Sequence, residues 1–137
     1  MTDYKGTSYS LARSSKDYRQ ANEFLKSEGV DYTGLSFPTI IARRPKGVVG
    51  VISTIRGEKR VIMGPLHIQI GEGNEIFTSI RMMSCYDGLL KEAGIERYWF
   101  WTPVENKKLI DICRQLGTYK EVQMNDNKDF IWFERSL

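Results

Sequence analysis

The fold is decided by the stretch from Arg60 to Gly117, which reads RVIMGPLHIQI, GEGNE, IFTSIRMMSCYDGLLKEAG, IERYWFWT and PVENKKLIDICRQLG in turn. The first segment is rich in apolar and β-branched residues and predicts a strand, and the glycines of GEGNE predict a loop. The third segment predicts a long helix that ends at Gly94, and the last segment predicts a helix that ends at Gly117. With the aromatic strand between these two helices, the stretch is a strand–loop–helix–strand–helix unit.

Hydrophobic spacing predicts which sides of these elements are buried. In the long helix the apolar stripe comprises Ile76, Ile80, Met83, Tyr86, Leu90 and Ala93. In the second helix Thr102 is expected as the N-cap and Pro103 as the first residue, and the inward side comprises Leu109, Ile112, Cys113 and Leu116. Pro65 cannot donate a backbone hydrogen bond to a sheet, so we expect it at a bulge or at a strand entry.

The rest of the chain adds further strands and one more helix. Residues 8–12 predict a strand, and the helix that follows is capped by Ser14, has Asp17 in its first turn and ends at Gly29. Residues 30–37 are ambiguous and allow a turn of helix. The remaining predicted strands, an antiparallel meander and a terminal hairpin, cover residues 39–43, 48–55, 60–70, 119–124 and 129–134. The order β-α-(α)-β-β-β-α-β-α-β-β predicts one α+β domain over residues 1–137, with a mixed sheet and helices on both faces.

Composition limits the class of protein. The chain has 137 residues, 41% of them hydrophobic and 12% aromatic, which is enough for a core in one domain. Its net charge of +3 permits an anionic ligand. The two cysteines, Cys85 and Cys113, show neither metal-ligand spacing nor a disulfide framework. Without an apolar signal core or a run of about 20 apolar residues, the sequence predicts a soluble, cytoplasmic protein with no membrane contact.

The last helix carries the pattern Asn106-x-x-Leu109-x-x-Ile112-Cys113-x-x-Leu116-Gly117. It resembles the last-helix pattern of the GNAT superfamily of acyl-CoA N-acyltransferases, Asn-x-x-Ala-x-x-(apolar)-Tyr-x-x-(apolar)-Gly-Phe. The resemblance implies a mixed, mostly antiparallel sheet in which the strand before the long helix and the strand after it splay apart. It also implies acetyl-CoA or another acyl-CoA as co-substrate, and direct transfer of the acyl group to an amine borne by a small molecule or a protein.

The cofactor site implied by the resemblance lies at the start of the long helix. Backbone N–H groups at a helix N-terminus bind anions such as a pyrophosphate. Two registers stay open for the phosphate cradle, Gly71-Glu72-Gly73 or the positions of Asn74, Phe77 and Ser79, and the pantetheine is expected along residues 66–70. The candidate cofactor-binding residues are Leu66, Ile68, Ile70, Gly71, Gly73, Asn74, Ser79 and Asn106.

Three residues are candidates for the proton transfers of an acyl transfer. His67 is the single histidine and lies on the strand before the loop, where it would take a proton from the attacking amine. Cys113 stands at the position of the family's tyrosine and would protonate the departing thiolate, and Tyr119 is a second candidate acid. The alternatives are a hydrogen-bonded strand histidine, a core cysteine and a packing tyrosine.

Two other functions remain open at this point. One is a catalytically inactive GNAT-like interaction protein, such as phages encode, which binds a macromolecular partner. The other is modification of a nucleic-acid base, because basic residues gather at strand ends and turns; charged turns also protect sheet edges, so nucleic acid is not the favoured partner. The edge of the terminal hairpin also makes a homodimer an expectation to test.

Overall fold

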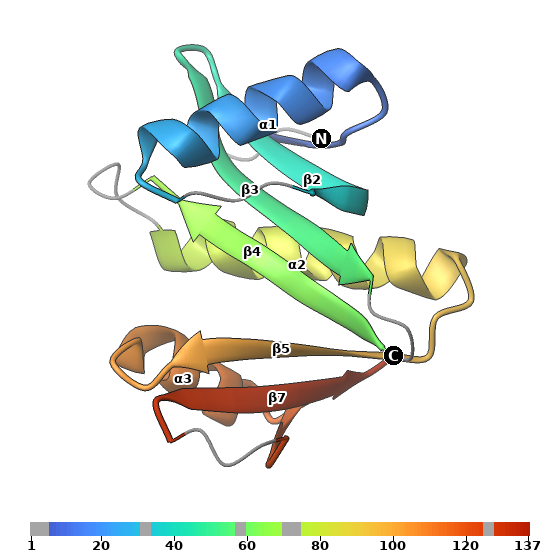
Figure 1. Ribbon diagram of the computed structural model, residues 1–137, viewed down its shortest axis with the longest axis vertical. Helices are drawn as coiled ribbons and strands as arrows, with labels where there is room; N and C mark the ends of the chain where they lie inside the picture. Colours follow the sequence, from blue (N-terminus) through green and yellow to red (C-terminus); the bar gives the residue numbers. More distant parts are fainter. Residues whose placement is uncertain (1–5, 31–33, 57–59, 70–74, 125–127) are drawn as a thin grey trace.

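Seven strands and three helices make up the part of the chain that the structure, a computed structural model, describes: residues 6–30, 34–56, 60–69, 75–124 and 128–137 (Figure 1). In chain order they are β1 (Ser8–Leu11), α1 (Ser15–Ser27), β2 (Ser36–Arg44), β3 (Gly47–Arg56), β4 (Val61–Ile68), α2 (Glu75–Glu92), β5 (Arg97–Pro103), α3 (Lys107–Leu116), β6 (Tyr119–Val122) and β7 (Phe130–Ser136). This is the predicted order. The turn of helix allowed in residues 30–37 is absent from the positions described there, since β2 already begins at Ser36.

All seven strands form one sheet in the order β1-β2-β3-β4-β5-β7-β6. Neighbours are antiparallel except β4 and β5, which are parallel. Helix α1 covers one face and packs with β2 and β3 around Phe24, Leu25 and Val51. Helices α2 and α3 cover the other face, where the larger core lies (Figure 1). The fold is therefore α+β, with a mixed, mostly antiparallel sheet and helices on both faces, as predicted.

The N-terminus of α1 is fixed by the residues that the sequence indicates. The Ser14 side chain accepts a hydrogen bond from the backbone N–H of Asp17 at 3.2 Å. In return the Asp17 carboxylate accepts from the backbone N–H groups of Arg13 and Ser14. These hydrogen bonds lower the pKa of Asp17. The capping box fixes where α1 begins, and apolar packing on β2 and β3 holds the helix with its C-cap residue Glu28 beside His67 on β4.

The buried stripe of α2 matches the predicted one at Met83, Tyr86 and Leu90 and differs from it at Ile80 and Ala93, and the side chain of Ile76 lies outside the described part of the chain. Its buried side carries Met82, Met83, Tyr86 and Leu90, whereas Ile80 is 38% exposed and Ala93 is also exposed. The Tyr86 hydroxyl lies 2.7 Å from Oγ1 of Thr54 on β3, which fixes the rotation of the helix about its axis. Hydrophobicity alone could not give this phase because both sides of the helix carry apolar residues.

The predicted start of α3 is wrong. Thr102 and Pro103 belong to β5, because that strand stays paired with β7 as far as Pro103 and Phe130. The helix begins at Lys107, with Asn106 at the N-cap position. Its inward residues include Cys113, as predicted, and Ile110, which was not predicted. Leu116 is 47% exposed instead of buried.

The predicted irregularity at Pro65 is confirmed. The β3–β4 register shifts between the pairs Ile52↔Leu66 and Thr54↔Met63, so two residues of β4 stand opposite one residue of β3. The extra residue falls at Gly64 and Pro65. As a result, both Met63 and Leu66 contact the core on the α2 side. None of the three helices described here is both long and apolar enough to cross a bilayer.

Candidate functional site

Strands β4 and β5 separate in the middle of the sheet. Among the described residues they share one paired position, Ile62↔Trp99. On their outer sides both remain in the sheet, β4 paired with β3 and β5 with β7. Figure 1 shows β4 and β5 close together at one end and far apart at their arrowheads. The divergence expected from the resemblance is therefore present, and it opens toward the end of the sheet at which β4 leads on to α2.

The backbone of β4 beyond Ile62 presents polar groups to the diverging side. The backbone N–H of Gln69 donates to the carbonyl of Val49 on β3 at 2.8 Å. Peptide groups of successive strand residues point to opposite sides, and hydrogen-bonded pairs alternate with non-bonded pairs in an antiparallel ladder. The N–H and C=O groups of Leu66 and Ile68 therefore point away from β3 and toward β5. These are two of the predicted cofactor-binding residues.

The predicted phosphate cradle falls mostly outside the described residues. Ile70, Gly71, Gly73 and Asn74 all lie there. Ser79 is half-buried one turn into α2, on the same side of the helix as Met82, Met83 and Tyr86. This side faces the sheet, so Ser79 lies on the sheet side of α2 close to its N-terminus.

Phe77 lies on a different side of α2. Its ring centroid is 6.0 Å from the guanidinium of Arg81, which in turn lies 5.9 Å from the ring centroid of Tyr9 on β1. Strand β1 is the edge of the sheet that is remote from β5. The Phe77 ring is therefore directed away from the place where β4 and β5 diverge.

His67 is held on the face of the sheet that carries α1. Its Nε2 lies 3.2 Å from Oε1 of Glu28, and its ring centroid is 5.8 Å from that of Phe24. The side chains of His67 and Glu28 are each 23% exposed. This gives a histidine with a carboxylate partner and partial access to solvent, the arrangement that a general base requires. Sequence reasoning found His67 but missed Glu28 and Phe24.

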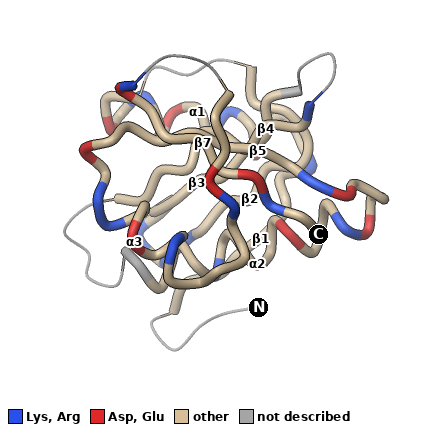
Figure 2. Tube along the Cα trace, turned by 90° about the horizontal axis from the view of Figure 1, so that it is seen from below, with Lys and Arg blue, Asp and Glu red and all other residues tan. Residues whose placement is uncertain are grey.

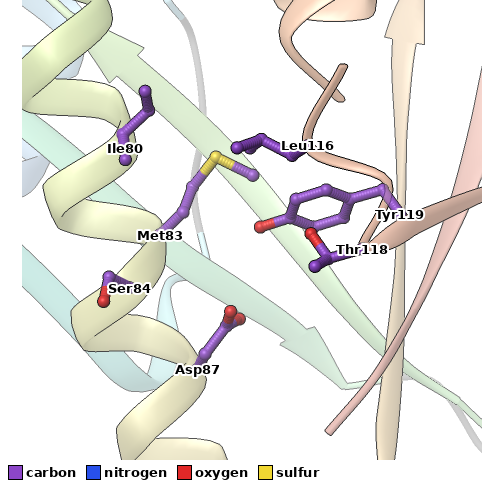
Figure 3. A pocket seen from close by; sticks show the side chains of 7 residues that line it. All are labelled: Ile80, Met83, Ser84, Asp87, Leu116, Thr118 and Tyr119. Atoms are coloured by element: carbon purple, nitrogen blue, oxygen red, sulfur yellow. The ribbon is translucent and has the colours of Figure 1, made fainter. Parts of the chain in front are cut away.

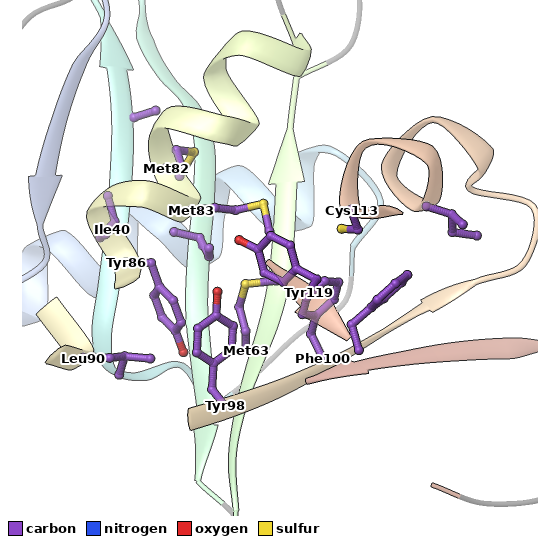
Figure 4. Close-up of a cluster of buried hydrophobic side chains, with 14 of the residues drawn as sticks. Ile40, Met63, Met82, Met83, Tyr86, Leu90, Tyr98, Phe100, Cys113 and Tyr119 are labelled. Carbon is purple, nitrogen blue, oxygen red and sulfur yellow. The ribbon is translucent and has the colours of Figure 1, made fainter. Parts of the chain in front are cut away.

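The two candidate acids lie on the opposite face, in the core between the sheet and helices α2 and α3. Cys113 points from α3 into this core and has no exposed surface (Figure 4). Burial raises the pKa of its thiol to about 12. Tyr119 is 8% exposed and contacts Phe100, with ring centroids 5.6 Å apart. Burial, followed by the negative charge of Asp87, raises the pKa of Tyr119 to about 12.

A small open pocket lies between α2 and the α3–β6 segment. Its volume is about 150 Å³, and it is lined by Ile80, Met83, Ser84, Asp87, Leu116, Thr118 and Tyr119 (Figure 3). Figure 3 shows the Tyr119 ring projecting from β6 toward Met83 on α2. Tyr119 therefore reaches a surface pocket, whereas Cys113 does not line it.

Asp87 links three elements beside this pocket, and no motif of the sequence indicates it. The Tyr98 hydroxyl donates to its Oδ1 at 2.6 Å, and Nε of Arg135 donates to its Oδ2 at 3.2 Å. The guanidinium of Arg135 also lies 5.6 Å from the Tyr119 ring centroid. Burial strongly raises the pKa of Tyr98. The network ties α2 to β5 and β7 on the far side of the divergence.

Two polar residues near the end of β5 complete the site. Asn106 is exposed and makes no capping hydrogen bond with its side chain. Thr102 is 2% exposed, and its Oγ1 has no hydrogen-bond partner within the part of the chain that the structure describes. Leaving a buried hydroxyl without a hydrogen-bond partner is unfavourable by about 1–3 kcal/mol. The Thr102 hydroxyl, at this end of the diverging strand β5, is therefore a candidate to donate a hydrogen bond to a ligand or to accept one from it.

Basic side chains do not collect into one surface on the described chain. Figure 2 shows short Lys and Arg segments scattered over the trace, several of them next to Asp and Glu segments. Arg43 illustrates this, because its guanidinium bonds Asp17 at 3.2 Å, Gln20 at 2.8 Å and Ser10 at 2.8 Å. Charges that are already paired within the fold contribute little to binding phosphates.

No family model matches the sequence, and no curated protein matches it. Solved structures do match. The ribosomal-protein-S18-alanine N-acetyltransferase from Escherichia coli gives a TM-score of 0.73 at 11% identity, over 95% of this chain and 93% of that one. An acetyltransferase of the GNAT family from Staphylococcus aureus Mu50 gives 0.68 at 12% identity, over 95% and 99%. A candidate acetyltransferase from Salmonella typhimurium, solved with its cofactor acetyl-CoA, gives 0.69 at 12% identity, over 96% and 94%. At these identities the likeness is one of fold.

Proposed function

We propose that this chain, which has the fold of the GNAT acyltransferases, moves an acyl group from an acyl-CoA to an amine by direct transfer, without a covalent enzyme intermediate. Acetyl-CoA is the first co-substrate to test. The acceptor is an amine on a small molecule or on a protein.

One observation carries the proposal, which is the separation of β4 and β5 after Ile62↔Trp99. The peptide groups of Leu66 and Ile68 point away from β3, toward the side on which β4 is no longer paired with β5. A pantetheine arm contains amide groups that can pair with a strand edge in the same way as a neighbouring strand. A backbone N–H at that edge is also a suitable donor to the developing oxyanion of an acyl transfer.

The remaining cofactor contacts follow the chain from β4 into α2. Ile70, Gly71, Gly73 and Asn74 precede the helix, and Ser79 follows in its first turns. An anion near this end of α2 is stabilised by the unpaired backbone N–H groups and by the helix dipole. Asn106, at the start of α3, is proposed to contact the same co-substrate from the other side.

The proton transfers are assigned to opposite faces of the sheet. His67, oriented by Glu28, takes a proton from the amine as nitrogen attacks the thioester carbonyl and the C–S bond breaks. The thiolate takes its proton from Tyr119, which lines the pocket between α2 and β6. Cys113 is the second candidate for this role. We rank it below Tyr119 because its side chain is fully enclosed in the core.

Calorimetry with acetyl-CoA tests the proposal. We expect micromolar binding to the wild-type chain, and we expect Ser79→Asp to weaken it at least about tenfold, because the new carboxylate repels the pyrophosphate at close range. Gly88→Asp is the matched control. It adds the same charge to α2 at an exposed position, where a Cβ meets nothing within 4 Å.

Equally weak acetyl-CoA binding in Ser79→Asp and Gly88→Asp would indicate a general effect of the added charge. It would contradict the assignment of the binding site to the N-terminus of α2. Absence of binding at millimolar acetyl-CoA would overturn the proposed activity. That result would leave a GNAT-like fold whose function is to bind a macromolecule.

A further inference from the structure

Aromatic side chains lie uncovered on one half of the sheet. Along β5, Tyr98, Phe100 and Thr102 are buried on the side of α2 and α3, so the alternate residues Trp99 and Trp101 point to the other face. The register pairs Trp101 with Trp132 and Pro103 with Phe130 on β7. We call Trp99, Trp101, Phe130 and Trp132 the aromatic face. On this side α1 covers β2 and β3, and no described helix covers β5 or β7 (Figure 1).

Within the aromatic face, Trp101 is the ring that is open to a ligand. Trp101 is 45% exposed, and its ring forms a T-shaped pair with that of Phe130, with centroids 4.7 Å apart and planes at 73°. Trp99 is already engaged, since its Nε1 donates to Glu134 at 3.3 Å and Arg60 lies 5.5 Å from its ring centroid. An exposed indole braced by a second aromatic ring is a ready stacking surface.

Trp101 and the proposed base lie on the same face of the sheet and on opposite sides of the divergence. His67 is directed toward α1, where it meets Phe24 and Glu28. Both His67 and Trp101 lie beyond the last shared pair, Ile62↔Trp99, one on each separating strand. An acceptor that brings its nitrogen to His67 from this face therefore has Trp101 across the divergence from it.

The charges around these residues favour one orientation of the acceptor. Arg60 lies over Trp99, at the end where the strands are still joined, and repels a cation. Glu28 lies at the open end, within hydrogen-bond distance of His67, and its carboxylate attracts a cation. An amine is a cation at neutral pH before it gives up its proton. Its ammonium group is thus directed toward His67 and Glu28, and away from Arg60.

We infer that the acceptor is a primary amine that carries a flat aromatic ring, with the ring stacked on Trp101 and the amine directed toward His67 and Glu28. This inference rests on the proposed acyl transfer, because His67 identifies the reacting end. It adds the class of acceptor, which the fold does not specify.

Calorimetry with tryptamine tests the inference without requiring turnover. The protein is titrated with tryptamine and with hexylamine, which has an amine and an apolar chain but no ring. We expect tryptamine to bind about three- to tenfold more tightly, the difference that stacking on an exposed indole provides. Equal affinities for the two amines, or no binding of tryptamine, would overturn the inference.

Two variants locate the effect at one ring. Trp101→Leu keeps an apolar side chain and removes the flat ring, and we expect it to lose the preference for tryptamine. Trp101→Phe restores a ring, and we expect it to keep most of the preference. A Trp101→Leu protein that still prefers tryptamine would contradict the inference. A Trp101→Leu protein in which only the oligomeric state changes, as measured by sedimentation, would also contradict the inference. That result would assign Trp101 to a contact between copies of the chain.

Acetyl-CoA affinity is measured separately on the same three proteins, and each tryptamine titration is run with and without acetyl-CoA. Absence of acetyl-CoA binding to the wild-type protein counts against the proposed acyl transfer. Unchanged acetyl-CoA binding together with equal affinity for the two amines counts against the aromatic acceptor alone. The two failures are therefore distinguishable.

Discussion

His67 gains its chemical character from a residue that is distant in sequence. Glu28 ends α1, and its carboxylate lies 3.2 Å from Nε2 of His67 on β4. A carboxylate partner fixes the orientation of an imidazole and stabilises the charge that it acquires when it takes up a proton. The pair therefore resembles the base and the orienting group of many proton-transfer sites.

We expect His67→Gln to lower kcat for acyl transfer about 100-fold or more, because general-base catalysis contributes roughly 10²–10⁴-fold. The affinity for acetyl-CoA should be unchanged, since His67 lies on the face of the sheet opposite α2. Steady-state kinetics with calorimetry of the co-substrate measures both quantities.

Glu28→Gln is the companion variant, and it should lower kcat less than His67→Gln because it acts through the histidine. A parallel loss of acetyl-CoA affinity in His67→Gln would indicate a structural role. An unchanged kcat would assign the proton transfer to another group.

At the scale of single residues, the sequence predicts which types carry chemistry but not their surroundings. The strand pattern places His67 on β4, yet its partners Phe24 and Glu28 come from a helix some forty residues earlier and meet it only through packing. Cys113 follows from a helical spacing, and the same spacing could not show that it is wholly enclosed. Asp87 belongs to no sequence motif, and Thr102 carried a helix-capping signal that the strand pairing overrides, so the surroundings of both depend on the assembled sheet.

Among the elements, α2 contains a glycine that its structure does not require. Gly88 lies in the exposed part of the helix, its φ is not positive, and a Cβ there would meet nothing within 4 Å. We expect Gly88→Ala to raise the free energy of unfolding by about 1 kcal/mol, because alanine loses less backbone entropy in a helix. Urea denaturation of the two proteins measures the difference.

Gly94 provides the contrasting case, because its φ is +78° and L side chains rarely adopt that conformation. Gly94→Ala should therefore lower stability by about 1 kcal/mol. Equal effects of the two substitutions would contradict this account of the helix and its C-terminus.

Element order was predictable because hydrophobic period and turn residues are local properties. Boundaries and helix phases were less so. Local capping signals at Thr102 and Pro103 predicted a helix start, but pairing with Phe130 and Ile131 on β7 extends the strand through both residues. The rotation of α2 is fixed by contacts such as Tyr86 with Thr54, which depend on the neighbouring strand.

For the molecule as a whole, buried tyrosines set a limit at high pH. Burial raises the pKa of Tyr119 to about 12 and that of Tyr98 further, above the ordinary value of 10. The unfolded chain therefore ionises these groups first. The stability that they contribute is complete below pH 10 and is lost as the pH rises toward the folded-state values.

We expect the free energy of unfolding to fall by about 2–3 kcal/mol between pH 10 and pH 12 through Tyr119 alone, at about 1.4 kcal/mol per pKa unit. Denaturant titrations across this range measure the slope. Tyr119→Phe should be less sensitive to pH over the same interval. An identical slope in that variant would show that Tyr119 ionises as readily in the folded protein as in the unfolded chain.

The arrangement of the whole sheet was predicted through resemblance more than through physics. Spacing between Asn106 and Gly117 pointed to a known architecture, and that architecture implied the divergence of β4 and β5. No local feature of the β4 or β5 sequence predicts that the described residues of the two strands share only one paired position. In the sequence, the residues of the aromatic face on β5 appear only as part of a run of aromatic residues. Which of them point away from α2 and α3 became known only from the structure, where these helices cover one side of the sheet.

The single paired position that β4 and β5 share has a consequence for the choice of acyl chain in the proposed reaction. Beyond Ile62↔Trp99 the spacing of these two strands is set by side chains and not by a ladder of backbone hydrogen bonds, as far as the described residues extend. Substitutions on the facing sides of these two strands can therefore change their separation, with the rest of the sheet left in register. Under the proposed acyl transfer, we expect a few such substitutions to change the bulk of the thioester that is accepted, with the proposed catalytic residues left in place.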